Sequence, residues 1–355
     1  MAALVSSNQS YVQVDEEGYF KLNDARVTDD AMGADWLAKI RIDEHRRAVL
    51  RFSPNEPETI VEAFDEPYVA VSIRPSSARA SWVAQMPYGY REAFKLNSLT
   101  VDEWDRFHGR TERGVPFVLS RAAQAAFFNI VDDYDDDGAT VAGERFEISP
   151  WLAPNLAMDQ SSYWSTIYQN ETPRWEMDAP SPVITAATPR LKLAKSRVLV
   201  LGAGSGSDAA FFAELGHSVT AVDFSAEAIA QARERHGARA GLRFEQADVF
   251  NLPDSMTNAF DLVIEHTCYC AINPSRRDEL VKVWRRCLAD RGHLMGVFFT
   301  IDKRDGPPFG ASEWELRSRL AKSFRSLYWM RARNSFAKRA GQETFIYAQK
   351  LSQFD

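Results

Sequence analysis

The second half of the chain alternates apolar runs of strand length with segments of helical character, and this alternation constrains the fold most. The expected strands are 197–201, 218–222, 242–246, 260–265 and 293–299, and the expected helices are 208–215, 226–236 and 275–288. Strands that alternate with helices form a parallel sheet with right-handed crossovers. The runs RVLVL and LMGVFF are apolar throughout, as strands buried on both faces are. We therefore predict an α/β fold with helices on both faces of a mainly parallel sheet.

A glycine-rich loop follows the first of these strands. Gly202, Gly204 and Gly206 form a G-x-G-x-G pattern directly after RVLVL. Such glycines let a ligand approach the backbone at the carboxyl end of a strand, beside a helix N-terminus. A tight strand-to-helix turn could also account for them. The dinucleotide fingerprint has its third glycine where this chain has Ser207, so the loop disfavours a nicotinamide cofactor.

Polar side chains stand at the ends of the next three strands. Asp223 ends the second strand, where a carboxylate can accept hydrogen bonds from ribose hydroxyls. Asp248 follows the third strand and could read an adenine amino group, itself or through a neighbouring amide. Glu265 and His266 end the fourth strand, which faces the reactive end of a ligand in an open sheet. Asp223 could instead cap the following helix, Asp248 could be an exposed acid of a loop, and His266 could be a hydrogen-bonded histidine of a loop.

Longer segments resemble one enzyme family, the thiopurine and thiol/halide methyltransferases. The matching segments are YWSTIYQNETPRWEMDAPSP (163–182), VLVLGAGSGSD (198–208), FDLVIEHTCYCAINPSRRDELV (260–281) and GVFFTIDKRDGPPFGASEWEL (296–316). The resemblance extends roughly over residues 161–350. It implies a class I Rossmann-like methyltransferase with a mainly parallel seven-stranded sheet. It also implies S-adenosylmethionine (SAM) as cofactor and S-adenosylhomocysteine as product.

The resemblance also assigns expected roles to individual residues. Trp164, Tyr168 and Trp175 would lie over the cofactor, with Tyr168 in place of the family's usual tryptophan; packing between the two halves of the chain is their alternative. The expected cofactor-binding positions in the sheet are Gly202, Gly204, Asp223, Asp248, Val249 and His266. Glu265 and His266 stand where the family often has Asp followed by Tyr or a similar residue, and this departure lies at the substrate end. Both are candidate catalytic residues that would orient the substrate or accept its proton.

The predicted activity is methyl transfer to a small soft nucleophile, with a thiol or a thiopurine sulfur favoured. Alternatives are a halide, selenium or tellurium acceptor, or a SAM-binding sensor or scaffold without turnover. Arg276 and Arg277 could favour an anionic substrate, although a solvated helix face is the preferred interpretation. Cys268 and Cys270, placed on one strand, are interpreted as core residues, because two cysteines and one histidine do not complete a zinc site.

Charge and composition restrict the classes of partner and the compartment that we expect. Asp and Glu outnumber Lys and Arg, which gives a formal net charge of −7 and makes a nucleic-acid partner unexpected. No apolar run is long enough for a membrane helix, and residues 1–10 lack the pattern of a signal peptide. The three cysteines form no disulfide framework, so we expect a cytoplasmic protein. The family resemblance implies a small-molecule acceptor, and we expect no metal. The oligomeric state stays open.

Residues 1–153 are expected to form a separate α+β domain of unknown function, followed by the methyltransferase domain at 154–355. The expected elements are a hairpin over 11–14 and 19–22, strands at 67–73 and 145–148, and a helix at 120–131. The segments GYFKLNDARVTD, EPYVAVSI and GVPFVLSRAAQAAFFNIV…ERFEISPWL resemble a small uncharacterised family from mitochondria and bacteria. Asp133–Glu144 fits an EF-hand pattern, but the strand-like exit favours an acidic hairpin turn.

Overall fold

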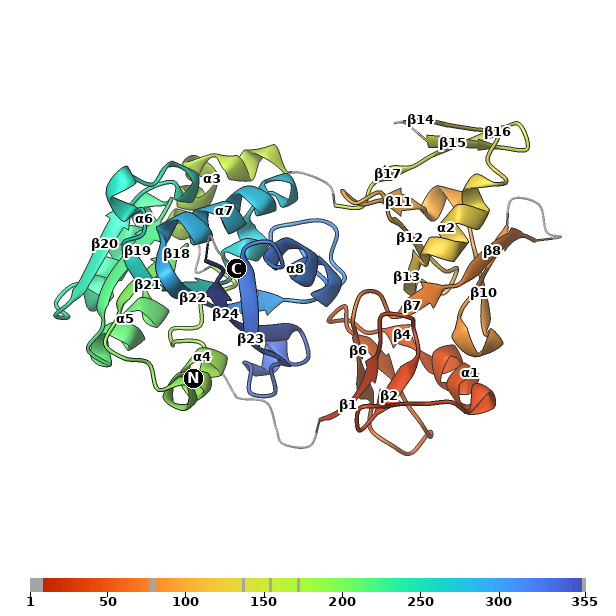
Figure 1. Cartoon of the computed structure of the whole chain (residues 1–355), viewed down its shortest axis with the longest axis horizontal. Helices are drawn as coiled ribbons and strands as arrows, with labels where there is room; N and C mark the ends of the chain where they lie inside the picture. Colours follow the sequence, from red (N-terminus) through yellow and green to blue (C-terminus); the bar gives the residue numbers. More distant parts are fainter. Residues whose placement is uncertain (1–8, 77–80, 136–137, 153–154, 171–172, 353–355) are drawn as a thin grey trace. The chain divides into compact units, whose positions relative to one another are not determined.

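The chain contains two compact units, which we describe separately. The computed structural model describes residues 9–76, 81–135, 138–152, 155–170 and 173–352 (Figure 1). In the described part of the chain, residues 9–152 and 312–314 make up the first unit, and residues 155–311 and 315–352 make up the second. No helix of the described residues is both long and apolar enough to cross a membrane.

Short strands dominate the first unit. They form sheets with the orders β3-β2-β1-β6-β5-β4, β10-β9-β8, β17-β11-β12-β13-β7 and β14-β15-β16. The elements are β1 (Ser10–Val14), β2 (Phe20–Leu22), β3 (Ala25–Arg26), α1 (Asp30–Lys39), β4 (Arg41–Ile42), β5 (Ala48–Leu50), β6 (Thr59–Ala63), β7 (Tyr68–Ala70), β8 (Ser72–Pro75), β9 (Trp82–Gln85), η1 (Pro87–Gly89), β10 (Arg91–Phe94), η2 (Leu96–Ser98), β11 (Thr100–Val101), β12 (Phe107–Arg110), β13 (Pro116–Leu119), α2 (Arg121–Phe128), β14 (Asp133–Asp135), β15 (Gly138–Val141), β16 (Glu144–Glu147) and β17 (Ser149–Pro150).

Local patterns predicted part of this unit. The first hairpin is present, with β1 paired antiparallel to β2, and Ser120 caps α2 through the amide of Ala123 at 3.2 Å. The single strand expected at 67–73 is wrong, because β7 and β8 belong to two different sheets. In the acidic segment, β14 and β15 form an antiparallel hairpin. Two of its residues, 136 and 137, lie outside the described part of the chain, and so does the predicted domain boundary at 153–154.

The second unit is built on a seven-stranded sheet with the order β20-β19-β18-β21-β22-β24-β23. β24 runs antiparallel to both of its neighbours, β22 and β23, and the other pairs of neighbouring strands in this sheet are parallel. This arrangement confirms the predicted Rossmann-like α/β class. The elements are η3 (Leu156–Asp159), α3 (Ser161–Asn170), α4 (Pro182–Leu191), β18 (Arg197–Leu201), α5 (Ser207–Glu214), β19 (Ser218–Asp223), α6 (Ala226–His236), β20 (Leu242–Gln246), η4 (Val249–Asn251), η5 (Asp254–Met256), β21 (Phe260–His266), η6 (Tyr269–Ala271), η7 (Pro274–Arg276), α7 (Arg277–Cys287), β22 (Leu288–Phe299), α8 (Glu313–Leu320), β23 (Phe324–Arg331), η8 (Ala337–Arg339) and β24 (Glu343–Lys350).

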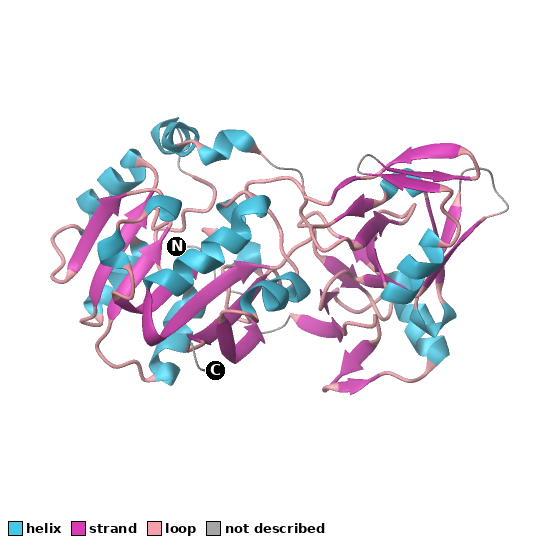
Figure 2. Cartoon of the chain, turned by 45° about the horizontal axis from the view of Figure 1, so that its top comes forward, coloured by secondary structure: helices cyan, strands magenta, loops and turns pink. Residues whose placement is uncertain are grey.

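Helices cover both faces of this sheet (Figure 2). Along β18, Val198 and Val200 pack into one apolar cluster with residues of α4, α5 and α6. The alternate residues Leu199 and Leu201 pack into a second cluster with residues of α7 and α8. Because side chains of a strand alternate between faces, an apolar run such as RVLVL needs this double cover. The carboxyl ends of the parallel strands remain as the edge where a ligand site can form.

Candidate active site

A cavity of about 320 Å³ lies at the carboxyl ends of the parallel strands. Every residue predicted to bind the cofactor lines it: Trp164, Tyr168, Trp175, Gly202, Gly204, Asp223, Asp248, Val249 and His266. The six that lie at strand ends follow the order of the sheet, from β20 across β19 and β18 to β21, and the three aromatic residues come from α3 and the segment after it. The cavity continues past β21 to Phe299 at the end of β22 and to Arg339 in η8. The cavity therefore has one end at the glycine loop, Asp223 and Asp248, and the other end at His266, Phe299 and Arg339.

The glycine loop is shaped by close approaches that exclude a side chain. Gly202 and Gly204 have φ values of 62° and 53°, which favour glycine. A Cβ atom on Gly202 would lie 2.8 Å from Cβ of Cys268, and one on Gly204 would lie 3.0 Å from the Tyr168 hydroxyl. The glycines thus serve the cavity wall as well as the turn into α5.

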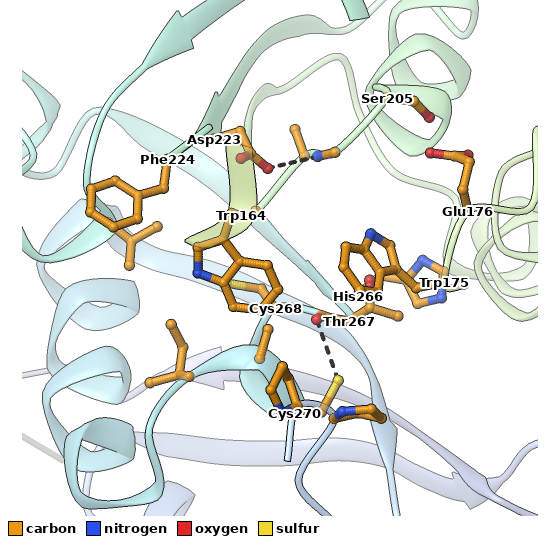
Figure 3. A pocket seen from close by; sticks show the side chains of 18 of the residues that line it. Trp164, Trp175, Glu176, Ser205, Asp223, Phe224, His266, Thr267, Cys268 and Cys270 are labelled. Atoms are coloured by element: carbon orange, nitrogen blue, oxygen red, sulfur yellow. Dashed lines mark hydrogen bonds between the residues drawn. The ribbon is translucent and has the colours of Figure 1, made fainter. Parts of the chain in front are cut away.

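The two carboxylates near β19 and β20 are held by the backbone. Asp223 accepts hydrogen bonds from the amides of Gly204 (2.8 Å) and Ser225 (2.9 Å), and the first of these bonds is drawn in Figure 3. Burial raises its pKa above the ordinary range. Since a carboxylate offers about four lone-pair directions, room remains for further donors. Asp248 accepts from the amide of Phe250 at 2.9 Å and so caps the N-terminus of η4. Ser225, rather than Asp223, caps α6.

Three aromatic residues that precede the first strand of this sheet, Trp164, Tyr168 and Trp175, form an aromatic wall of the cavity. Trp164 and Tyr168 lie on α3, and Trp175 follows, with its ring centroid 5.7 Å from that of Trp164 and 6.1 Å from that of Tyr168. Trp175 donates from Nε1 to the Tyr168 hydroxyl at 3.1 Å, and Trp164 donates to the carbonyl of Met158 at 2.8 Å. Burial raises the pKa of Tyr168, which keeps the hydroxyl protonated.

His266 is held between an acid and a cation. Its Nδ1 lies 2.6 Å from Oδ2 of Asp208, and Arg339 donates to its Nε2 at 3.0 Å. The other oxygen of Asp208 accepts from the amide of Ser181 at 2.7 Å. Burial opposes ionisation of Asp208, but the electrostatic effect and hydrogen bond of His266 lower its pKa below the ordinary value. Asp208 ends the motif VLVLGAGSGSD that carries the family resemblance, but no role was predicted for it, and the sequence did not single out Arg339.

Glu265 does not line the cavity. The residue is fully buried, and its Oε1 accepts from the amides of Cys268 (3.0 Å) and Tyr269 (2.7 Å). Its Oε2 has no hydrogen-bond partner, and burial raises its pKa to about 7. Glu265 therefore stabilises the turn after β21.

That turn contains a strained residue and two cysteines. Thr267 lines the cavity with a φ of 64°, a conformation that is costly for a β-branched residue and recurs at functional sites. Cys268 and Cys270 are buried as expected but lie beyond β21 rather than on it, and both line the cavity. Burial raises the pKa of both thiols, which keeps them neutral. Cys270 donates to the carbonyl of Thr267 at 3.3 Å (Figure 3).

The two arginines at the start of α7 have different surroundings. Arg276 lines the cavity, and its guanidinium carbon lies 3.5 Å from the ring centroid of Phe250. Arg277 is fully buried and pairs with Glu315 at 2.8 Å. The preferred interpretation of both as a solvated helix face is wrong for Arg277, because a buried partner from α8 compensates its charge. In the described residues, no group of three or more His, Cys, Asp or Glu residues could hold a metal ion.

Comparison with known proteins identifies the family. The family model described as Thiopurine S-methyltransferase matches residues 159–348, which is more than half of the chain. The chain belongs to the thiopurine S-methyltransferase family. A member of this family uses SAM, so the second unit contains a SAM-dependent methyltransferase, as the sequence predicted.

Relatives of this thiopurine S-methyltransferase family member include plant enzymes. Thiocyanate methyltransferase 1 of Arabidopsis thaliana is 29% identical over 177 residues, which is 49% of this chain and 76% of the relative. Probable thiol methyltransferase 2 of the same plant is 26% identical over 166 residues, 45% of this chain and 73% of the relative. A solved structure of Burkholderia thailandensis 1,6-didemethyltoxoflavin-N1-methyltransferase is 24% identical and covers 62% of this chain and 99% of that one, with a TM-score of 0.45.

Proposed function

We propose that the cavity binds SAM across β20, β19 and β18 and transfers its methyl group to a small soft nucleophile, a thiol or thiopurine sulfur. The observation that carries this proposal is the convergence of the glycine loop, Asp223 and the aromatic wall on one cavity. The names of the relatives, a thiocyanate and a thiol methyltransferase, support a sulfur acceptor. The same soft-nucleophile chemistry leaves a halide, selenium or tellurium acceptor as the alternative.

The residues present fit this cofactor. Gly202 and Gly204 line the cavity and carry no side chain, so a ligand can approach the backbone of the loop. We assign the free lone pairs of Asp223 to the ribose hydroxyls, and Asp248 with the amide of Val249 to the adenine edge. The rings of Trp164, Tyr168 and Trp175 would cover the ligand, where an aromatic face attracts the sulfonium cation.

The proposed mechanism is direct displacement. SAM supplies a methyl group that its sulfonium has already activated, so the protein contributes alignment and a dry site. The aromatic wall excludes water from one side, and the apolar side chain of Phe299 does so near the end of β22. Of the two predicted catalytic residues, we place His266 at the acceptor end and assign Glu265 to the turn that supports it.

We further propose that residues 154–355 carry this activity with a small-molecule acceptor and without nucleic acid or membrane, and that residues 1–153 form a separate domain of unknown function. The net charge of −7 and the three free cysteines support a cytoplasmic protein with this kind of partner. A SAM-binding sensor without turnover is the competing function, and the test below separates it.

The test is transfer from methyl-labelled SAM to a panel of thiols, sulfide, thiopurines, iodide and selenite. Labelled product from one sulfur acceptor is expected with the wild type and not with Asp223→Ala, which removes the ribose-binding carboxylate. Binding of SAM without any transfer would favour the sensor. A wild-type protein that binds no SAM would refute the proposal.

A further inference from the structure

The acceptor end of the cavity contains a buried cation whose orientation is fixed. Arg339 is 3% exposed and lines the cavity. Its Nη1 donates to His266 Nε2 at 3.0 Å and to Glu343 at 3.4 Å, and its Nη2 donates to the carbonyl of Trp175 at 2.9 Å. A guanidinium has five N–H donors. In the described part of the chain, no acceptor contacts Nε of Arg339, so donors remain for a ligand.

The same contacts determine the proton position on His266. A guanidinium only donates, so Nε2 of His266 must accept, and the ring proton must lie on Nδ1. From there it is donated to Asp208 at 2.6 Å. The lone pair that a general base would use is therefore occupied by Arg339. This geometry does not suit His266 as the group that deprotonates a thiol.

We propose that Arg339 binds the methyl acceptor as an anion and that His266, oriented by Asp208, positions Arg339 instead of acting as a base. This inference rests on the proposed function. The carboxylates of Glu343 and Asp208 compensate the positive charge of Arg339. We therefore attribute recognition of the anionic acceptor to the fixed directions of the N–H donors of Arg339. A negative acceptor also complements the sulfonium. The acceptor class is then a soft nucleophile that is already ionised near neutral pH, such as an acidic thiol or a thiocyanate-like anion.

Thiocyanate distinguishes a base role of His266 from a positioning role, because thiocyanate has no proton to lose. Its sulfur attacks the methyl carbon, the bond from methyl to sulfonium breaks, and the electron pair stays on S-adenosylhomocysteine. A neutral alkyl thiol such as 2-mercaptoethanol must also release a proton. Loss of a base would therefore affect only the thiol, whereas loss of a positioning residue affects both acceptors.

The first experiment compares kcat/KM for thiocyanate and 2-mercaptoethanol in the wild type, His266→Ala and His266→Gln. We expect His266→Ala to lower kcat/KM for thiocyanate at least tenfold, mainly through KM. We expect His266→Gln to recover part of it, because its amide oxygen can accept from Arg339. Unchanged thiocyanate turnover with lost thiol turnover in His266→Ala would establish the base role and overturn the proposal.

The second experiment needs no turnover. Binding of thiocyanate to the protein saturated with S-adenosylhomocysteine is measured by tryptophan fluorescence in the wild type, Arg339→Gln and Arg325→Gln. Arg325 carries the same charge but lies exposed on β23, where it contacts Gln349. We expect the Kd to rise at least tenfold in Arg339→Gln alone. An equal Kd in all three proteins, or no thiocyanate binding to a wild type that binds S-adenosylhomocysteine, overturns the inference. A wild type that does not bind S-adenosylhomocysteine contradicts the proposed function instead.

Discussion

Glu265→Gln should change how the stability of the protein depends on pH. Glu265 is fully buried, and burial raises its pKa from an ordinary value of 4.5 to about 7. The native state therefore binds a proton more tightly than the unfolded chain does. As pH rises from about 4.5 to about 7, the unfolded carboxyl ionises first, and the free energy of unfolding falls; above the native pKa the loss is complete.

The magnitude follows from the two pKa values. Their difference corresponds to about 3 kcal/mol in total, of which about 2 kcal/mol falls between pH 5.5 and pH 8.5. Glu265→Gln removes the ionisation and keeps an oxygen for the amides of Cys268 and Tyr269. Relative to the wild type, the variant should thus be about 2 kcal/mol more stable at pH 8.5 than at pH 5.5.

Urea denaturation at the two pH values, without ligand, measures this difference for wild type and variant. Other titrating groups are common to both proteins and cancel in the comparison. The exposed Glu234→Gln serves as a control and should follow the wild type. If Glu265→Gln also follows the wild type from pH 5.5 to pH 8.5, the carboxyl of Glu265 does not titrate as its burial requires, and the reasoning is refuted.

Three further outcomes are expected. SAM affinity, measured by calorimetry at several pH values, should fall on acidification, and the fall should begin at a higher pH than for an ordinary aspartate because burial raises the pKa of Asp223. Asp223→Asn should bind SAM weakly at every pH. If its SAM affinity instead falls in parallel with that of the wild type, the assignment of Asp223 to the ribose is contradicted. Gly202→Ala should destabilise the protein by about 1–2 kcal/mol from its backbone conformation alone, and by more from the contact with Cys268, which thermal unfolding would detect. Arg277→Ala should cost about 3 kcal/mol, since Glu315 loses a buried partner, and a change below 1 kcal/mol would show that Arg319 alone compensates this carboxylate.

The sequence predicted those parts of the fold and site that depend on local order. A strand, a glycine turn and a helix within about twenty residues define where Gly202 must lie. Because parallel strands end at one edge, the acid after the next strand, Asp223, must lie beside it. Strands that are apolar throughout, such as RVLVL, then indicate that helices cover both faces of the sheet. These inferences needed no knowledge of distant contacts.

The acceptor end could not be predicted in the same way. Arg339 meets His266 across 73 positions of sequence, and no periodic pattern marks such a pair. The burial of Arg277 depends on Glu315 in another helix, which a helical pattern does not reveal. Glu265 was expected to face the ligand because it ends a strand, but side chains of a strand alternate, and its neighbour His266 takes that direction.

The position of β24 in the sheet has a consequence for synthesis. β23 pairs only with β24 within the sheet, and β24 follows it in the chain. While the ribosome has not yet released residues 343–350, β23 has no strand to bind, and the exposed Leu327, Tyr328 and Met330 lie on it. An unpaired strand with apolar side chains promotes aggregation. Between the synthesis of these two strands, the nascent chain therefore presents an unpaired strand that is prone to aggregate.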